Sequence, residues 1–359
     1  MTTIQNFAIP VTCHAFNADN SQIALSLNNN ILNIYSLSSG NNSDIKLLHS
    51  LDEHTAIITG VDWAKNTNRI VTCSADRNAY VWTLVDGKLW KPILVILQIN
   101  RAATCVRWSP LENKFAVGSA ARMISVCYFE EEQNWWVSKH IKKPIRSSIT
   151  CLDWHPNNIL LATGSTDFRT RVFSAYMKTV DSKPGDTPWG DKLNFQKLLF
   201  EYLPTSHGGW VHSVSFSPDG NKMAWVSHNS TVSVVDATQN MHVTTVRHQF
   251  LPFVTCEWIA PASLLTAGHD CCPFVFSYDG PNALALQQQI TLKGEVKKAA
   301  HSAMRKFQDI DKKATDQDVG AQLETIHQNA INEIRIVVGS KSGAQKFSTI
   351  GKDGRIVFW

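Results

Sequence analysis

The chain has 359 residues, of which 43% are hydrophobic and 18% are charged, an ordinary globular composition that allows a large core. No stretch approaches about 18 uninterrupted apolar residues, and the first residues lack a basic and an apolar segment, so we expect neither a membrane span nor a secretory signal. The net charge of +4 is mild for this length and does not by itself indicate a nucleic-acid binder.

A unit of about 45 residues repeats along the whole chain. Each copy predicts an alternating strand that ends in an aromatic residue, then a polar turn, a strand of small residues, a second turn and another alternating strand. The aromatic positions lie 47, 45, 46, 62 and 42 residues apart, at Phe16, Trp63, Trp108, Trp154, Phe216 and Trp258. A seventh copy has Ile336 at this position and reaches Trp359.

The stretch "HGGWVHSVSFSPDG" at residues 207–220 is close to the consensus of WD40 repeats, and its spacing recurs from His54 and from His327. This resemblance implies an all-β fold: a seven-bladed WD40 β-propeller of four-stranded blades, a single domain over residues 1–359. The last copy predicts only three strands. We therefore expect the segment around residues 3–9 to supply the outer strand of the seventh blade, because closing the ring removes exposed edges.

The early repeats contain residue types that are also found in catalytic sites. His54, Thr72, Asp76 and Trp82 have the composition of an acid–base site, but in WD40 proteins such a set is a hydrogen-bonded group that stabilises a blade. The chain has no GxSxG, P-loop or HExxH motif and no paired ligands at metal spacing. We expect a structural tetrad, no enzyme activity, no metal and no cofactor.

The eight cysteines include no CxxC pair. Buried thiols in a reducing compartment are the favoured interpretation, ahead of disulfides or a metal site.

A basic stretch, "KHIKKPIR" at residues 139–146, joins the third and fourth repeats. Because Lys142 and Lys143 precede Pro144, we expect an extended, exposed turn. Two interpretations remain open: a solvated loop, or a site at which Lys142, Lys143 and Arg146 receive an acidic peptide.

Two long intervals interrupt the repeats. Residues 174–203 predict a long loop followed by a strand near residues 198–202, with Trp189 as a packed anchor or as a binding residue. Residues 279–325 predict an insertion between the sixth and seventh blades. Within it, apolar residues follow a 3.6-residue period near residues 296–313, which indicates a protruding amphipathic helix.

This predicted helix is basic, because residues 293–313 hold seven Lys or Arg against three Asp or Glu. Three placements remain open. The helix packs on the rim of the propeller and buries Phe307, lays its apolar face in a groove of a partner, or lies weakly on a membrane surface.

Several phrases go beyond what a propeller requires, among them "AYVWTL", "KHIKKPIR", "TPWG" and "KFQDIDKKA". Together they make the whole chain resemble the family of WD40-repeat subunits of the actin-related protein 2/3 complex. This resemblance implies a non-catalytic structural and actin-binding subunit that supports nucleation of branched actin filaments. It implies a cytoplasmic location on the actin cytoskeleton. The implied partners are actin-related protein 2, other subunits of the complex, the actin filament, and acidic C-terminal segments of nucleation-promoting factors.

The same resemblance suggests two sets of contact residues. Lys142, Lys143 and Arg146 would receive the acidic segment. An actin-fold surface would be touched by the insertion through Met304, Arg305, Phe307 and Ile310. Neither nucleic acid nor membrane insertion is expected.

The alternative is a WD40 scaffold that acts as a substrate receptor or peptide reader in another complex. That alternative predicts a ring of aromatic and charged residues at the mouth of the central channel.

Overall fold

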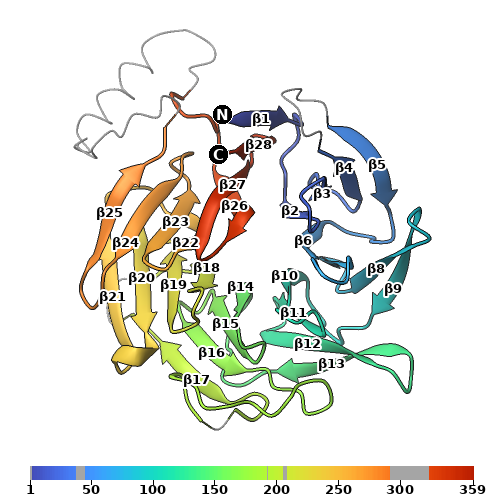
Figure 1. The fold of residues 1–359 in the computed structure, drawn as a ribbon, viewed down its shortest axis with the longest axis horizontal. Coiled ribbons are helices and arrows are strands. Elements are labelled where there is room, and N and C mark those ends of the chain that lie inside the picture. The colour runs from blue at the N-terminus through green and yellow to red at the C-terminus, as the bar shows by residue number, and fades with distance from the viewer. Residues whose placement is uncertain (1, 38–44, 192, 205–207, 292–322) are drawn as a thin grey trace.

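The computed structural model describes residues 2–37, 45–191, 193–204, 208–291 and 323–359. Its strands form seven four-stranded antiparallel sheets, arranged as blades around a central axis (Figure 1). This is the seven-bladed β-propeller predicted from the repeat. The described residues hold one short 3-10 helix, η1 (Ala237–Gln239), and none of their helices is long and apolar enough to cross a membrane.

Six blades each come from one continuous stretch of chain, and their strands run from the innermost to the outermost in chain order. Blades one to three comprise β2 (Cys13–Phe16), β3 (Gln22–Ser26), β4 (Leu32–Ser36), β5 (Lys46–Leu51); β6 (Ile58–Trp63), β7 (Ile70–Ser74), β8 (Ala79–Val85), β9 (Leu89–Val95); and β10 (Ala103–Trp108), β11 (Lys114–Ser119), β12 (Met123–Glu130), β13 (Trp135–Ile141). Blades four to six comprise β14 (Ile149–Trp154), β15 (Leu160–Ser165), β16 (Thr170–Ser174), β17 (Leu198–Tyr202); β18 (Val211–Phe216), β19 (Lys222–Ser227), β20 (Thr231–Asp236), β21 (His242–Arg247); and β22 (Phe253–Ala260), β23 (Ser263–Gly268), β24 (Phe274–Tyr278), β25 (Leu284–Gln289).

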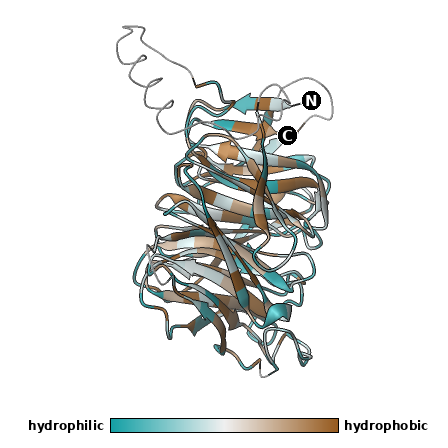
Figure 2. Ribbon diagram, turned by 90° about the vertical axis from the view of Figure 1, so that its left-hand side faces the viewer, coloured by the Kyte–Doolittle hydropathy of each residue, from teal (hydrophilic) through white to brown (hydrophobic). Residues whose placement is uncertain are grey.

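Blade seven is built from segments near both ends of the sequence. Its inner strands are β26 (Ile331–Ser340), β27 (Gly343–Gly351) and β28 (Arg355–Phe358), and its outer strand is β1 (Thr3–Asn6). β1 pairs with β28 in the antiparallel sense, and the N and C marks lie close together in Figures 1 and 2. The predicted outer strand from the N-terminal segment is confirmed, and this pairing closes the ring.

The core lies between neighbouring blades. The described buried apolar residues form seven clusters, each drawn from two adjacent blades. Small residues on the second strands allow this close approach: a Cβ on Gly164 would lie 2.5 Å from Cγ1 of Val211 in the next blade. A single blade cannot cover both of its own faces, so each blade is stabilised by its neighbours.

The first long interval folds as predicted. β17 (Leu198–Tyr202) occupies the predicted strand, and Trp189 is only 2% exposed. The indole Nε1 of Trp189 donates to the carbonyl of Gly220 at 2.8 Å, so this side chain is a packed anchor of the loop.

The second interval is shorter than the range 279–325 predicted for the insertion. β25 lies inside that range and is the outer strand of blade six, so the connection to blade seven begins after Gln289. The predicted helix near residues 296–313, with Met304, Arg305, Phe307 and Ile310, lies outside the described residues.

The described residues include all eight cysteines and contain no disulfide, and six of these cysteines are buried. Burial raises the pKa of Cys271 to about 11 and that of Cys151 to about 12, so these two thiols stay protonated at neutral pH.

Candidate functional site

The four residues of the predicted tetrad meet inside blade two. His54 Nδ1 lies 2.7 Å from Asp76 Oδ2, and His54 Nε2 lies 2.8 Å from Thr72 Oγ1. The same hydroxyl oxygen accepts a hydrogen bond from Nε1 of Trp82 at 3.0 Å. Burial lowers the pKa of His54 below its ordinary value, against the opposing effect of Asp76, which favours a neutral ring. The neutral ring donates to Asp76 and accepts from Thr72.

An acid, a histidine and a hydroxyl in this order have the composition of a nucleophilic triad. Here the hydroxyl is inaccessible, because Thr72 is fully buried and Trp82 is 2% exposed. A substrate therefore does not reach Oγ1 without opening the blade. The geometry is that of an internal hydrogen-bond chain that joins the turn before β6 to β7 and β8.

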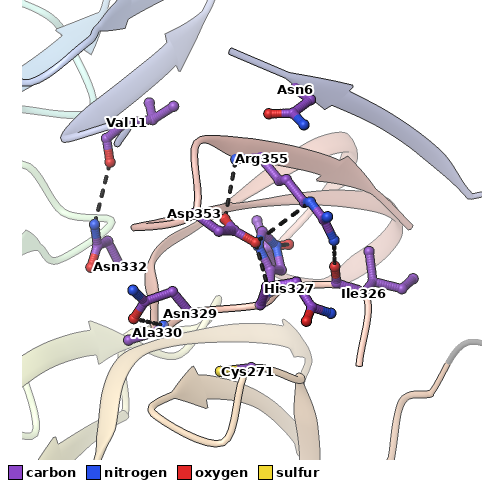
Figure 3. A network of polar contacts seen from close by, with 12 residues as sticks. Asn6, Val11, Cys271, Ile326, His327, Asn329, Ala330, Asn332, Asp353 and Arg355 are labelled. Atoms are coloured by element: carbon purple, nitrogen blue, oxygen red, sulfur yellow. Dashed lines mark hydrogen bonds and ion pairs between the residues drawn. The ribbon is translucent and has the colours of Figure 1, made fainter. Parts of the chain in front are cut away.

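A second chain of the same kind lies in blade seven and was not singled out from the sequence. His327 bonds Asp353 through Nδ1 at 3.1 Å (Figure 3). Its Nε2 lies 2.8 Å from Thr349 Oγ1. Trp359 Nε1 donates to the same hydroxyl at 2.9 Å. The histidine and threonine are 22 residues apart here and 18 apart in blade two, because the β26–β27 hairpin is longer, so the spacing that recurs from His327 did not indicate Thr349.

The predicted basic residues sit on the tight turn between β13 and β14. The amide of Ile145 donates to the carbonyl of Lys142 at 3.0 Å, and the Ile145 side chain is buried between blades three and four. This anchor leaves Lys142, Lys143 and Arg146 exposed. Within the described part of the chain, none of the three takes part in an ion pair. The prediction of an exposed turn agrees with this geometry, and the turn is tight where the sequence indicated an extended one.

Two further arginines lie at the same end of blade three and were missed in the sequence. Arg122 is in the turn before β12, and Ile124 of β12 pairs with Ile141, the last residue of β13. Arg101 lies two residues before β10, whose start is at this end as well. Both are exposed. We call the five exposed residues the basic face: Arg101, Arg122, Lys142, Lys143 and Arg146.

The nearby arginines of blade four are already neutralised. Arg171 is fully buried and pairs with Asp167 and Glu201, both at 2.7 Å. Arg169 pairs with Glu201 at 2.8 Å. These two side chains stabilise their own blade, and they are not part of the basic face.

Charged side chains from different blades meet across the central channel. Arg335 of blade seven bonds Asp62 of blade two at 3.3 Å, and Arg107 of blade three bonds Glu333 of blade seven at 3.0 Å. Glu333 also lies 2.9 Å from Nδ1 of His14 in blade one. The sequence signal for this network is positional: Asp62, Arg107 and Arg335 each come one residue before the aromatic position of their repeat or its Ile336 equivalent.

Glu333 is the centre of this network. Burial would raise the pKa of its carboxyl, but Arg335, His14 and Arg107 together hold it well below its ordinary value. A carboxylate that stays ionised here links blades one, three and seven through hydrogen bonds that are stronger than neutral ones.

The channel widens into a cavity of about 500 Å³ at the end where the inner strands finish. Its walls include aromatic side chains and charged groups from several blades: Trp63, Trp108, Trp154, Asp62, Asp153, Glu257 and Lys341. Within the ranges that the structure describes, no group of three or more His, Cys, Asp or Glu side chains is arranged to hold a metal ion.

The family model for the WD domain, G-beta repeat, matches residues 45–83, 138–174 and 197–236. Among curated proteins, the chain is 56% identical to actin-related protein 2/3 complex subunit 1A-B of Xenopus laevis, over 98% of this chain and 94% of the relative. It is 55% identical to subunit 1A-A of the same frog, over 98% and 94%. It is 40% identical to subunit 1 of the fission yeast Schizosaccharomyces pombe, over 96% and 95%.

These matches extend over almost the full length of the chain and of the relatives, so they include all seven blades and the connections between them. The chain belongs to the family of actin-related protein 2/3 complex subunit 1.

Proposed function

We propose that this protein is a non-catalytic structural subunit of the actin-related protein 2/3 complex and that it supports nucleation of branched actin filaments. The observation that carries the proposal is the 56% identity to a named subunit 1 over 98% of the chain. The buried tetrads agree with it, since they place their histidines in the blade interiors, away from any substrate.

Co-purification tests this assignment. The full chain, tagged and expressed in cells of its own organism, should bring down actin-related protein 2 and the other subunits of the complex at stoichiometric levels. Recovery with a ligase adaptor or with histones instead would support the substrate-receptor alternative. The same experiment tests the cytoplasmic location if it is done on separated cell fractions.

We propose next that the basic face receives the acidic C-terminal segment of a nucleation-promoting factor. The support is that Lys142, Lys143 and Arg146 are exposed on an anchored turn, next to two exposed arginines of blade three. A single exposed ion pair contributes roughly 0.2–1 kcal/mol, so several charges acting together are needed. Such binding weakens as salt screens the charges.

Charge reversal in the assembled complex tests whether the basic face binds the acidic segment. Lys142→Glu, Lys143→Glu and Arg146→Glu together should weaken binding of the acidic segment by at least about tenfold at low salt, with a smaller loss at high salt. The matched control is Lys46→Glu, Lys88→Glu and Lys91→Glu, which makes the same change of charge on exposed residues of blades one and two, at the end of the strands opposite to the basic face. Wild-type affinity at every salt concentration would exclude the basic face.

For the insertion, we propose that Met304, Arg305, Phe307 and Ile310 contact an actin filament. These residues lie outside the described part of the chain, and the support is the family resemblance of the stretch "KFQDIDKKA". Full burial of Phe307 in a partner would contribute about 1.5–3 kcal/mol. Complex carrying Phe307→Ala and Ile310→Ala should co-sediment less with filaments and form fewer branches, whereas Gln308→Ala should not change either. Unchanged co-sedimentation and branching would reject the contact.

A further inference from the structure

The hairpin of β26 and β27 reaches over the cavity at the channel mouth. These strands have 10 and nine residues and are the longest of the described strands. The tip of the hairpin bends at Gly339, whose φ is +96°, a backbone conformation that favours glycine. A Cβ at this position would lie 2.2 Å from the carbonyl oxygen of Gly343, so another residue would force the tip out of place.

The tip places Lys341 among acceptors from three other blades. Its ammonium lies 2.7 Å from Asp153 of blade four and 3.0 Å from Glu257 of blade six. It also donates to Ser215 Oγ at 3.1 Å and to the carbonyl of Phe216 at 3.3 Å, both in blade five. Burial would lower the pKa of this ammonium, but Asp153 and Glu257 raise it above its ordinary value, so the group is a cation at neutral pH.

The surroundings suit a lysine side chain in general. Trp154 and Phe216 line the same cavity as the two carboxylates, so an apolar stem meets aromatic walls and its charged end meets acids. The volume of about 500 Å³ is typical of a ligand site and exceeds what one lysine fills. The Lys341 side chain is still 28% exposed, which means that solvent and other molecules reach it.

We propose that the channel mouth is a receptor for a basic side chain of a partner polypeptide, and that Lys341 is a built-in occupant that the partner's lysine replaces. The hairpin tip, bent at Gly339, is the part that moves aside. This site is distinct from the basic face, because it lies where the inner strands end, whereas Arg101 precedes the start of one. It holds carboxylates where the basic face holds cations, so an acidic segment is not its ligand.

The test uses the full chain and two model ligands that differ only in the terminal ammonium group, N-acetyl-lysine N-methylamide and N-acetyl-norleucine N-methylamide. Calorimetry or NMR titration should show that Lys341→Ala binds the lysine compound roughly tenfold or more tightly than the wild type does, since the internal competitor is gone. The same variant should prefer lysine to norleucine by roughly tenfold or more, because a hydrogen bond to a charged group contributes at least that factor.

Two further variants separate a binding site from a purely structural tie. Gly339→Ala displaces the tip but keeps the lysine, so it should also gain affinity for the lysine compound, and it replaces Lys341→Ala if that variant does not fold. Adding Asp153→Asn to Lys341→Ala should remove the preference for lysine. Equal binding of lysine and norleucine, or no gain in either variant over the wild type, would overturn the proposal and leave Lys341 as a link between blades.

Discussion

Blade two and blade seven carry the same internal hydrogen-bond chain but are joined to the ring in different ways. The clusters on the two sides of blade two contain 12 and 15 described buried apolar residues. Those on the two sides of blade seven contain seven and five. Blade seven instead forms ion pairs and hydrogen bonds with residues of five other blades through Glu333, Arg335 and Lys341.

This difference indicates how the ring is closed. Blade seven is assembled from segments near both ends of the sequence, so its fourth strand is held by β1–β28 pairing and not by a covalent turn. Ion pairs and the long hairpin add directional links where the apolar interface is small. The comparison predicts that blade seven is sensitive to loss of pairing and of charge, whereas blade two depends on its apolar neighbours.

The largest effect is expected from removing the closing strand. Deletion of residues 2–9 removes the four-residue pairing of β1 with β28 and should cost more than about 4 kcal/mol of unfolding free energy. The measurement is thermal or urea denaturation followed by circular dichroism. As a control, Thr3→Ala with Gln5→Ala keeps the backbone bonds and should change stability little. An unchanged melting curve after deletion would show that β1 does not hold the ring closed.

The next effect concerns the charge at the centre of the channel. Glu333→Gln leaves Arg107 and Arg335 without their shared carboxylate. The loss should be up to about 3–5 kcal/mol at pH 7, the range for a fully buried ion pair, because Glu333 is only 13% exposed. Urea denaturation at fixed pH measures this loss. A cost near zero would mean that the network does not stabilise blade seven.

The pH dependence of stability gives a second test of the role of Glu333. The pKa of Glu333 is held below its ordinary value in the folded protein, so its contribution is present above the unfolded pKa and is lost as the pH falls toward the folded one. Wild-type stability should therefore decline from about pH 5 to pH 3 more steeply than that of Glu333→Gln. Parallel curves for the two proteins would contradict this assignment of the acid-sensitive group.

The two tetrads allow a matched pair of substitutions. The expected loss of unfolding free energy is smaller than that for Glu333→Gln and larger than that at the basic face. Asp76 accepts hydrogen bonds from His54 and from the amide of Thr55, and Asp353 accepts from His327 and from the amide of Gln328. These hydrogen bonds correspond, and the additional ion pair of Asp353 with Arg355 is long, at 3.9 Å. Asp76→Ala and Asp353→Ala should therefore each cost about 2–3 kcal/mol in urea unfolding. A much larger loss in blade seven would mean that its tetrad, and not its channel charges, compensates for the small apolar interface.

The smallest effect is expected at the basic face. Lys142→Glu, Lys143→Glu and Arg146→Glu together should change the unfolding free energy by less than about 0.5 kcal/mol per residue, because the three side chains are exposed and free of ion pairs among the described residues. Differential scanning calorimetry measures this change. A large loss would indicate a structural role for the turn and would complicate its use as a docking surface.

Much of the architecture was determined by the sequence alone. The seven copies of the repeat, from Phe16 to Ile336, predicted the number of blades, and the missing strand of the seventh copy predicted the closure by the N-terminal segment. The order His54, Thr72, Asp76 and Trp82 indicated a tetrad whose members the structure brings into contact. Strand pairing and turn chemistry are local in a propeller, so a regular repeat is enough to specify them.

Only the tertiary structure decided which side chains meet across the ring. Arg107 and Glu333 are 226 residues apart, and Lys341 and Asp153 are 188 apart. The exposure of Arg101 and Arg122 beside Lys142 depends likewise on how one sheet folds back on itself. A repeat specifies that alternate residues of each inner strand face the channel. Which opposite charges face one another depends on the number of blades, the curvature of the ring and the length of the β26–β27 hairpin, and none of these is a property of a single repeat.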